Sequence, residues 1–165
     1  MHWRVASCRP AALAAAAMTV SLAAASGAAL AASPFAGLRG SWSGSGHVLL
    51  DGGRREAIRC SANYVARSGG RSLGLALRCA SASNRVELRA SLAARGSHVS
   101  GTWEERSFGV SGGISGTATG NHLRLSFNGG LSGAMVVNTS GASQSISVRT
   151  DASALKGVNV SLRRR

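Results

Sequence analysis

Apolar and polar residues alternate along most of the chain after residue 37, a period of two that is typical of β-strands with one buried face. In one such run Ile58, Cys60, Ala62 and Tyr64 share one parity and Arg59 takes the other. Segments rich in glycine, serine and asparagine separate these runs at spacings near ten residues. No helical period of useful length interrupts them. The pattern predicts an all-β fold, a single antiparallel up-and-down meander of eight to ten strands.

A single open sheet of that length would leave two unpaired edges, which proteins avoid. Closing the meander into a barrel removes both edges, so we expect an eight- to ten-stranded barrel rather than a sandwich. The expected barrel domain covers residues 38–165, and residues 32–37 form a short N-terminal lead.

The first 31 residues have the pattern of a signal peptide. Arg4 and Arg9 precede a long alanine-rich apolar run, and the tripeptide Ala29-Leu30-Ala31 has small residues at the positions that signal peptidase recognises. A retained N-terminal anchor is the alternative, because the apolar run approaches the ~20 residues that span a bilayer. We predict cleavage after Ala31 with loss of Trp3, and a periplasmic or secreted protein that has no membrane span after cleavage.

Two glycine-containing turns allow the strand register to be predicted. If Gly69 and Gly70 are the central residues of a hairpin turn, where both positions favour positive φ, residues equidistant from that turn face each other. The predicted pairs are Cys60 with Cys79, Ala62 with Leu77 and Tyr64 with Leu75; a turn at Gly120-Asn121 adds Ile114 with Phe127 and Ala118 with Leu123. Both hairpins keep one face apolar.

Cysteines that meet across a hairpin of an exported chain are expected to form a disulfide, and two buried thiols are the alternative. Counting from the predicted turn places Cys60 and Cys79 at a hydrogen-bonded position, where Cα atoms are about 5.5 Å apart. A zinc site would need more ligands than these two. Since His47, His98 and His122 take the outward parity, we predict no metal and no cofactor.

One pattern occurs twice: an aliphatic residue, any residue, glycine, serine or threonine, then tryptophan, ending at Trp42 and at Trp103. Glycine beside a ring presents no side chain, so each ring has room to lie along the sheet. A three-residue loop after Asp51 would set Trp42 opposite Tyr64. A turn at residues 95–96 would set Trp103 opposite Leu88.

Two roles for these tryptophans stay open. They are either core residues without a ligand, or part of the wall of a ligand cavity, because many other inward positions are glycine or alanine. The candidate ligand-binding residues are Trp42, Tyr64, Leu75 and Trp103.

The tripeptide Gly40-Ser41-Trp42, early in the first strand, is similar to the Gly-x-Trp signature of the calycins, which include lipocalins, fatty-acid-binding proteins and avidins. The resemblance implies that Trp42 closes one barrel end, often beneath an arginine of the last strand, for which Arg149 and Arg163 are candidates. The Asp-Tyr pair of the second lipocalin motif is absent. The chain also resembles uncharacterised exported proteins of Gram-negative bacteria, a likeness that implies no activity.

The predicted mature chain is strongly basic. Of the 19 basic residues, 17 remain after removal of Arg4 and Arg9, against 6 acids, a net charge of +11, and every base except Lys156 is arginine. Such an excess is typical of proteins that bind nucleic acid, anionic lipid or acidic polymers. The strand arginines take the outward parity, and aromatic residues make up only 4% of the chain. Stacking platforms are therefore few, and nucleic acid is not an expected partner.

No catalytic motif points to an enzyme. Glu104 and Glu105 are adjacent, so on a strand they point to opposite faces and cannot act as an acid and base pair. Glu56 and Glu105 take the inward parity, where burial would raise a carboxyl pKa, but both lie near predicted strand ends that water reaches. Two non-enzymatic functions remain: binding of a small, partly apolar ligand inside the barrel, or binding of an anionic envelope component or a protein, as inhibitor barrels bind proteases, through the arginine-rich exterior and loops.

Overall fold

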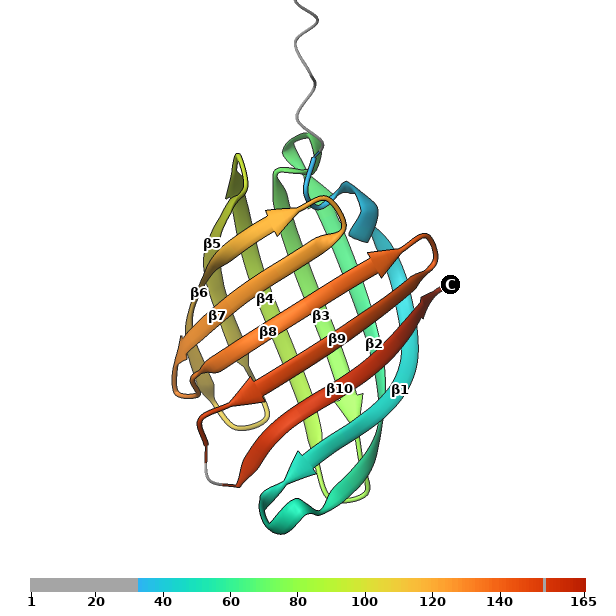
Figure 1. The fold of residues 1–165 in the computed structure, drawn as a ribbon, viewed down its shortest axis with the longest axis vertical. Coiled ribbons are helices and arrows are strands. Elements are labelled where there is room, and N and C mark those ends of the chain that lie inside the picture. The colour runs from blue at the N-terminus through green and yellow to red at the C-terminus, as the bar shows by residue number, and fades with distance from the viewer. Residues whose placement is uncertain (1–32, 153) are drawn as a thin grey trace, which may run out of the picture. The chain divides into compact units, whose positions relative to one another are not determined.

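Within the residues that the structure describes, ten antiparallel strands close into a barrel (Figure 1). This computed structural model describes residues 33–152 and 154–165. Each strand pairs with the next along the chain, and the last pairs with the first, which confirms the predicted meander and its closure. The strands are β1 (Gly40–Leu50), β2 (Arg55–Arg67), β3 (Ser72–Ala80), β4 (Arg85–Arg95), β5 (His98–Glu105), β6 (Val110–Thr119), β7 (His122–Gly129), β8 (Gly133–Ser140), β9 (Ser143–Thr150) and β10 (Leu155–Arg164).

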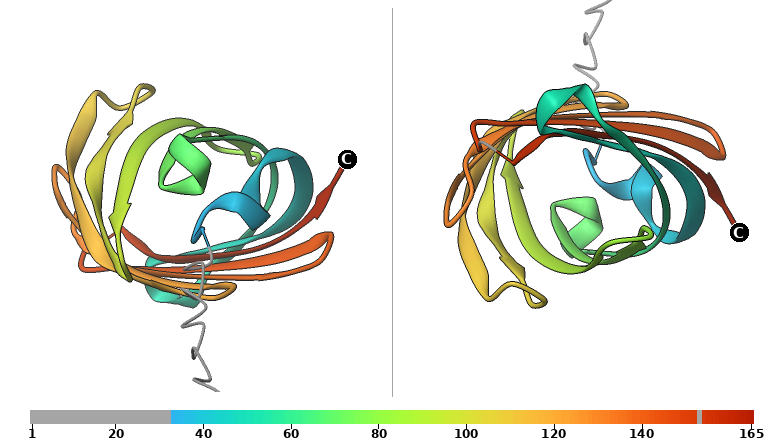
Figure 2. Two further views of the ribbon diagram at one scale, coloured as in Figure 1. Left: turned by 90° about the horizontal axis from the view of Figure 1, so that it is seen from above. Right: turned by 90° about the horizontal axis from the view of Figure 1, so that it is seen from below.

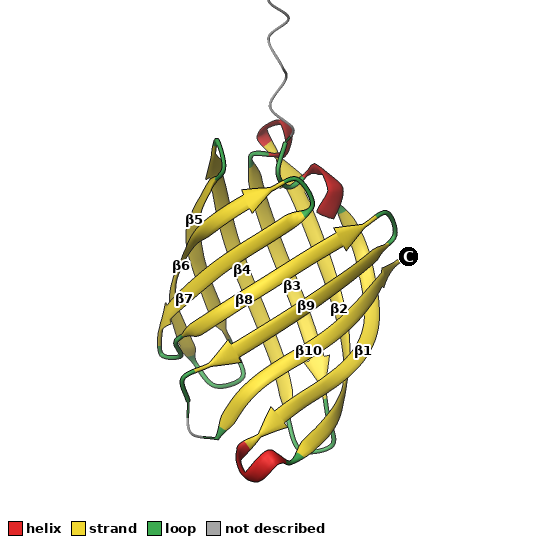
Figure 3. Ribbon diagram, viewed as in Figure 1, coloured by secondary structure: helices red, strands yellow, loops and turns green. Residues whose placement is uncertain are grey.

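Short 3₁₀ turns mark the two ends of the barrel (Figure 3). The turn η1 (Ala36–Leu38) precedes β1, and η3 (Ser68–Gly70) connects β2 with β3 at the same end; η2 (Asp51–Gly53) connects β1 with β2 at the other. Seen along the barrel, η1 and η3 lie within its outline, whereas η2 lies at its rim (Figure 2). We call these the η1 end and the η2 end.

The connections differ between the ends. At the η1 end, Gly96-Ser97, Gly120-Asn121 and Gly141-Ala142 are two-residue turns. Each begins with a glycine at φ near +60°, a conformation that side chains with a Cβ disfavour. At the η2 end the connections are longer and span residues 51–54, 81–84, 106–109, 130–132 and 151–154.

Both predicted hairpin registers are confirmed. Cys60 pairs with Cys79, Tyr64 with Leu75 and Ala62 with Leu77, and the second hairpin pairs Ile114 with Phe127 and Ala118 with Leu123. The turn between β2 and β3 is wider than expected, because the paired residues end at Arg67 and Ser72 and η3 forms the tip.

The predicted partners of the two tryptophans are wrong by two residues. Trp42 pairs with Ala62 instead of Tyr64, because the first hairpin is centred on Gly52, where Leu50 N–H donates to the Arg54 carbonyl. Trp103 pairs with Ala90 instead of Leu88, because the turn is Gly96-Ser97 rather than Arg95-Gly96. Since each error is two residues, both rings keep the predicted inward face.

The predicted signal peptide, its cleavage site and Trp3 lie outside the described residues, so these stay predictions. Among the described residues, no helix is both long and apolar enough to span a bilayer.

Candidate ligand-binding interior

The N-terminal lead closes the η1 end of the barrel. Phe35 is fully buried, and Leu38 in η1 is 3% exposed. Phe35 N–H donates to the Gly70 carbonyl at 3.2 Å, which ties the lead to η3. Residues 35–38 therefore act as a plug, a role that the sequence interpretation did not assign to the lead.

Trp42 lies directly beneath this plug and is 1% exposed. Its Nε1 donates to the Leu38 carbonyl at 2.8 Å, and its ring meets Tyr64 edge-on with 6.5 Å between centroids. The arginine over the ring is Arg164, whose guanidinium carbon lies 4.7 Å from the ring centroid. The candidates Arg149 and Arg163 were therefore wrong. The inward parity of Val158, Val160 and Leu162 was the signal that could have identified Arg164.

A chain of hydrogen bonds crosses the interior near the η1 end. Tyr64 Oη on β2 donates to Gln144 Oε1 on β9 at 2.9 Å, and Gln144 Nε2 donates to Thr139 Oγ1 on β8 at 3.4 Å. All three side chains are buried. Burial raises the pKa of Tyr64 to about 12, against an opposing effect of the Gln144 hydrogen bond, so the phenol is neutral at physiological pH. Sequence reasoning missed Gln144 and Thr139, because a contact between residues 80 apart follows only from closure of the barrel.

The four candidate residues form one continuous part of the inner wall. Tyr64, Leu75, Ala90 and Trp103 are successive cross-strand partners in a row from β2 to β5. Trp42 joins this row through its contact with Tyr64. The structure thus brings the predicted residues together, while their role as ligand contacts stays a prediction.

Trp103 extends across two neighbouring strands. Its cross-strand partner on β6 is Gly112, whose own partner on β7 is Gly129, so no side chain obstructs the ring. Trp103 Nε1 donates to the Asn128 carbonyl at 3.1 Å, and the ring meets Phe127 edge-on with 6.0 Å between centroids. The module around Trp103 therefore builds an aromatic wall, whereas the module around Trp42 closes an end.

Most inward apolar side chains toward the η2 end are only partly buried, although Ile58, Cys79 and Trp103 in that half are buried. The partly buried side chains come from nearly every part of the wall and pack against the core, yet solvent reaches each of them. They are Val48, Leu77, Val86, Leu88, Val110, Phe127, Met135, Ile146 and Val158. Inward residues nearer the η1 end, such as Leu92, Val99, Leu123 and Leu162, are buried. The inward side chains are therefore buried more completely toward the η1 end than toward the η2 end, with Ala66 and Leu75 on the η1 side as partly buried exceptions.

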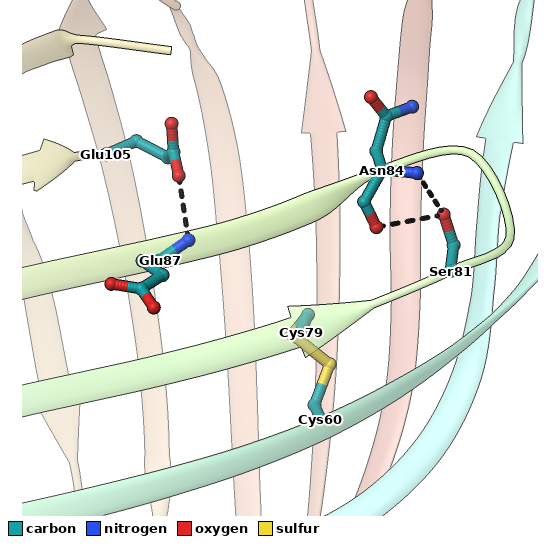
Figure 4. Close-up of a disulfide and its surroundings, with 6 residues drawn as sticks. All are labelled: Cys60, Cys79, Ser81, Asn84, Glu87 and Glu105. Atoms are coloured by element: carbon teal, nitrogen blue, oxygen red, sulfur yellow. Dashed lines mark hydrogen bonds between the residues drawn. A yellow bond between two sulfur atoms is a disulfide. The ribbon is translucent and has the colours of Figure 1, made fainter. Parts of the chain in front are cut away.

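Cys60 and Cys79 form the predicted disulfide between β2 and β3 (Figure 4). Their Cα atoms are 4.1 Å apart, closer to the ~4.5 Å of a non-hydrogen-bonded pair than to the ~5.5 Å we expected. The expected distance was wrong: the ladder ends at Arg67 and Ser72, and η3 stands where we had counted from a two-residue turn. The bridge covalently joins two strands of the solvent-accessible half.

The two inward glutamates hold loops at the η2 end. Glu105 is 6% exposed, although we expected water to reach it, and it accepts hydrogen bonds from the backbone N–H groups of Glu87, Ser107 and Phe108 at 2.7 to 3.0 Å (Figure 4). Burial raises the pKa of Glu105, but these bonds outweigh burial and hold the pKa below its usual range. Hydrogen bonds from Ser83 lower the pKa of Glu56. Neither inward carboxyl group therefore has the raised pKa that burial alone would give it.

Two hollows lie on the outer wall rather than in the interior. The first, about 320 Å³, lies over β1 to β4, and its outward side chains include Ser41, Asn63, Arg78, Arg89 and Arg165. The second, about 500 Å³, continues from Arg89 across β5 to β6. The small side chains between the arginines leave this part of the wall concave.

Two solved structures share this architecture. One is Rv2717c from M. tuberculosis, with a TM-score of 0.66 and 18% identity over 83% of this chain and 98% of that one. The other is the S-type phycobiliprotein lyase CPES from Guillardia theta, with a TM-score of 0.58 and 10% identity over 79% of this chain and 90% of that one. The chain therefore shares the antiparallel β-barrel fold of these two proteins. At these identities the likeness concerns the fold alone. No protein-family model and no curated protein matches the chain.

Proposed function

We propose that this calycin-like barrel is an exported, non-enzymatic protein that binds a small, partly apolar ligand in its interior and admits it at the η2 end. The observation that carries the proposal is the burial gradient along the barrel. Most inward apolar side chains near η1 are buried, whereas most of those near η2 remain partly exposed. Covering that apolar surface with a ligand would gain about 25 cal/mol for each Å² removed from water.

Two further observations support parts of the proposal. Export rests on the signal-peptide pattern of residues 1–31. A non-enzymatic role is favoured because the inward carboxylates, Glu56 and Glu105, already accept hydrogen bonds from loop residues, which commits them to structural roles.

The test is a titration with N-phenyl-1-naphthylamine, an uncharged dye that becomes fluorescent in apolar surroundings. The matched variants Leu88→Gln and Arg89→Gln place the same residue on opposite faces of β4, since Leu88 points inward and Arg89 outward. We expect saturable binding by the parent, roughly tenfold weaker binding by Leu88→Gln because a polar amide enters the apolar wall, and no change with Arg89→Gln. Absence of saturable binding by the parent contradicts an interior ligand.

A second candidate function rests on the outer hollow over β1 to β4. Arg165 is fixed there by its Nε, which donates to Ser43 Oγ at 2.8 Å, and Arg78 is held by Glu87 at 3.3 Å. Fixed guanidinium groups around a concave surface suit an anionic envelope component such as lipopolysaccharide. The same two variants test this function: Arg89→Gln should weaken lipopolysaccharide binding and Leu88→Gln should leave it unchanged. Equal binding by both variants contradicts this candidate.

A further inference from the structure

The charges of the barrel are divided sharply between its two faces. Among the strand positions that point inward in the described part of the chain, Glu56, Glu105 and Arg164 are the charged residues. The other arginines of the strands point outward, and those of the described loops lie at the barrel ends. The strongly basic character of the chain therefore belongs to its outer surface.

Each of these three charges is already engaged. Glu105 accepts three backbone hydrogen bonds, and Glu56 is held by Ser83 through both of its oxygens. Arg164 donates to the Gly37 carbonyl and stacks on Trp42, so it lies at the η1 end with the buried indole between it and the rest of the interior. A ligand that enters from the η2 end meets no cation along the partly exposed apolar wall.

The polar groups deepest in the interior are neutral. Tyr64, Gln144 and Thr139 bond to one another, and no buried side-chain nitrogen or oxygen among the described residues lacks a partner. Burying a carboxylate costs a large free energy unless a cation or several donors compensate it. This interior supplies the apolar wall for a hydrocarbon chain but no partner for an anionic head group.

We infer that the interior selects uncharged amphiphiles, such as alcohols and esters, over carboxylates of the same chain length, and the inference rests on the proposed interior binding. The excess of arginine on the outside does not reverse this preference, because exposed charges are screened within about 10 Å at 0.1 M ionic strength. The outer charge attracts anions to the surface, and the lining of the interior then discriminates against them.

The experiment compares matched ten-carbon probes by displacement of N-phenyl-1-naphthylamine at pH 7.5 in 0.15 M salt. We expect 1-decanol and methyl decanoate to displace the dye, decanoate to bind at least tenfold more weakly than decanol, and decylamine not to exceed decanol. Decanoate binding should strengthen as the pH falls toward 5, because its neutral form becomes more populated.

A substitution that adds a cation to the interior tests the inferred selectivity in a second way. Met135 points inward from β8 and is partly exposed near the η2 end, where a lysine can keep its ammonium group in water. Met135→Lys should raise decanoate binding relative to decanol by about tenfold, and the matched control Met135→Leu should keep the parent ratio. If Met135→Lys does not fold, the decanoate-to-decanol ratio of the parent still decides the question.

The possible results separate the two proposals. Decanoate binding as tightly as decanol or tighter, or decylamine binding more tightly than decanol, overturns the inferred selectivity while leaving interior binding intact. Failure of every probe and of the dye to bind overturns interior binding and the selectivity with it.

Discussion

The two ends of this barrel show different solutions to the same closure problem. At the η1 end, two-residue turns bring neighbouring strands together, and Phe35, Leu38 and Trp42 fill the space between them. At the η2 end the connections are longer, no comparable plug is present among the described residues, and inward side chains such as Leu88 and Met135 remain partly exposed.

This difference separates the sources of stability from the proposed site of binding. Dense packing makes the η1 end sensitive to any loss of volume, since interiors are close-packed and cavities are costly. The η2 end retains apolar surface that has not been removed from water, and this surface is what a ligand could cover. Substitutions at the two ends should therefore affect different measurements.

The largest effect is expected for Trp42→Ala. Removing this fully packed ring should lower the free energy of unfolding by about 3 to 5 kcal/mol, measured by urea denaturation. Trp42→Phe, which keeps an aromatic ring, serves as the control and should cost less. A loss below about 1 kcal/mol for Trp42→Ala would show that the η1 end is not the packed core described above.

Matched leucines compare the two ends directly. Leu162 is 1% exposed in the sealed half, whereas Leu88 is partly exposed in the accessible half. We expect Leu162→Ala to cost about 3 to 5 kcal/mol and Leu88→Ala about half as much or less, since part of the Leu88 side chain is already in water. Equal losses in urea denaturation would remove the difference in packing between the ends.

The disulfide should stabilise the accessible half. Its sequence separation of 19 corresponds to a contribution on the order of 3 kcal/mol in the chain-entropy model, and less if the hairpin persists in the unfolded state. Urea denaturation with and without reductant measures it, and Cys60→Ala with Cys79→Ala is the thiol-free control. Thiol labelling of the folded, unreduced protein should modify neither cysteine; labelling of both would contradict the bridge.

The raised pKa of the buried Tyr64 phenol predicts that the protein loses stability at high pH. Its pKa is raised from 10.0 to about 12 by burial, so the folded state favours the protonated phenol. This contribution is fully present below pH 10, and up to about 3 kcal/mol is lost as the pH rises from 10 to 12. Tyr64→Phe should abolish that part of the pH dependence, while costing about 1 to 2 kcal/mol at neutral pH because Gln144 loses its buried donor. An identical pH profile for both proteins contradicts the assignment.

Local signals in the sequence were sufficient to predict much of the fold. The alternation of residues such as Ile58, Cys60 and Tyr64 predicts the faces of the strands, and glycine turns predict two hairpin registers and the cysteine pairing. The registers of Trp42 and Trp103 were predicted wrongly because their turns contain several adjacent small residues. A shift of two residues in strand register leaves every side chain on the same face of the sheet. The hydrophobic pattern therefore does not distinguish between the two registers.

Contacts created by closure could not be predicted from local patterns. The hydrogen bond between Tyr64 and Gln144 joins strands β2 and β9, which become neighbours across the interior only when the barrel closes. Phe35 lies in the lead of residues 32–37, which carries no strand period and was assigned no role, and Leu38 was expected to belong to the barrel domain rather than to a plug. The difference in burial between the two barrel ends likewise depends on which end this plug closes, and no strand pattern indicates that end.

The central claim, that a ligand enters the η2 half and stops below the packed η1 end, is tested most directly by quenching of single tryptophans. The predicted mature chain, without Trp3, contains Trp42 and Trp103, so in it Trp42→Phe reports on Trp103 and Trp103→Phe reports on Trp42. An uncharged brominated alcohol, 11-bromo-1-undecanol, should quench Trp103 saturably and quench Trp42 markedly less. Saturable quenching of Trp42 in preference to Trp103, or no saturable quenching of either, would contradict the account.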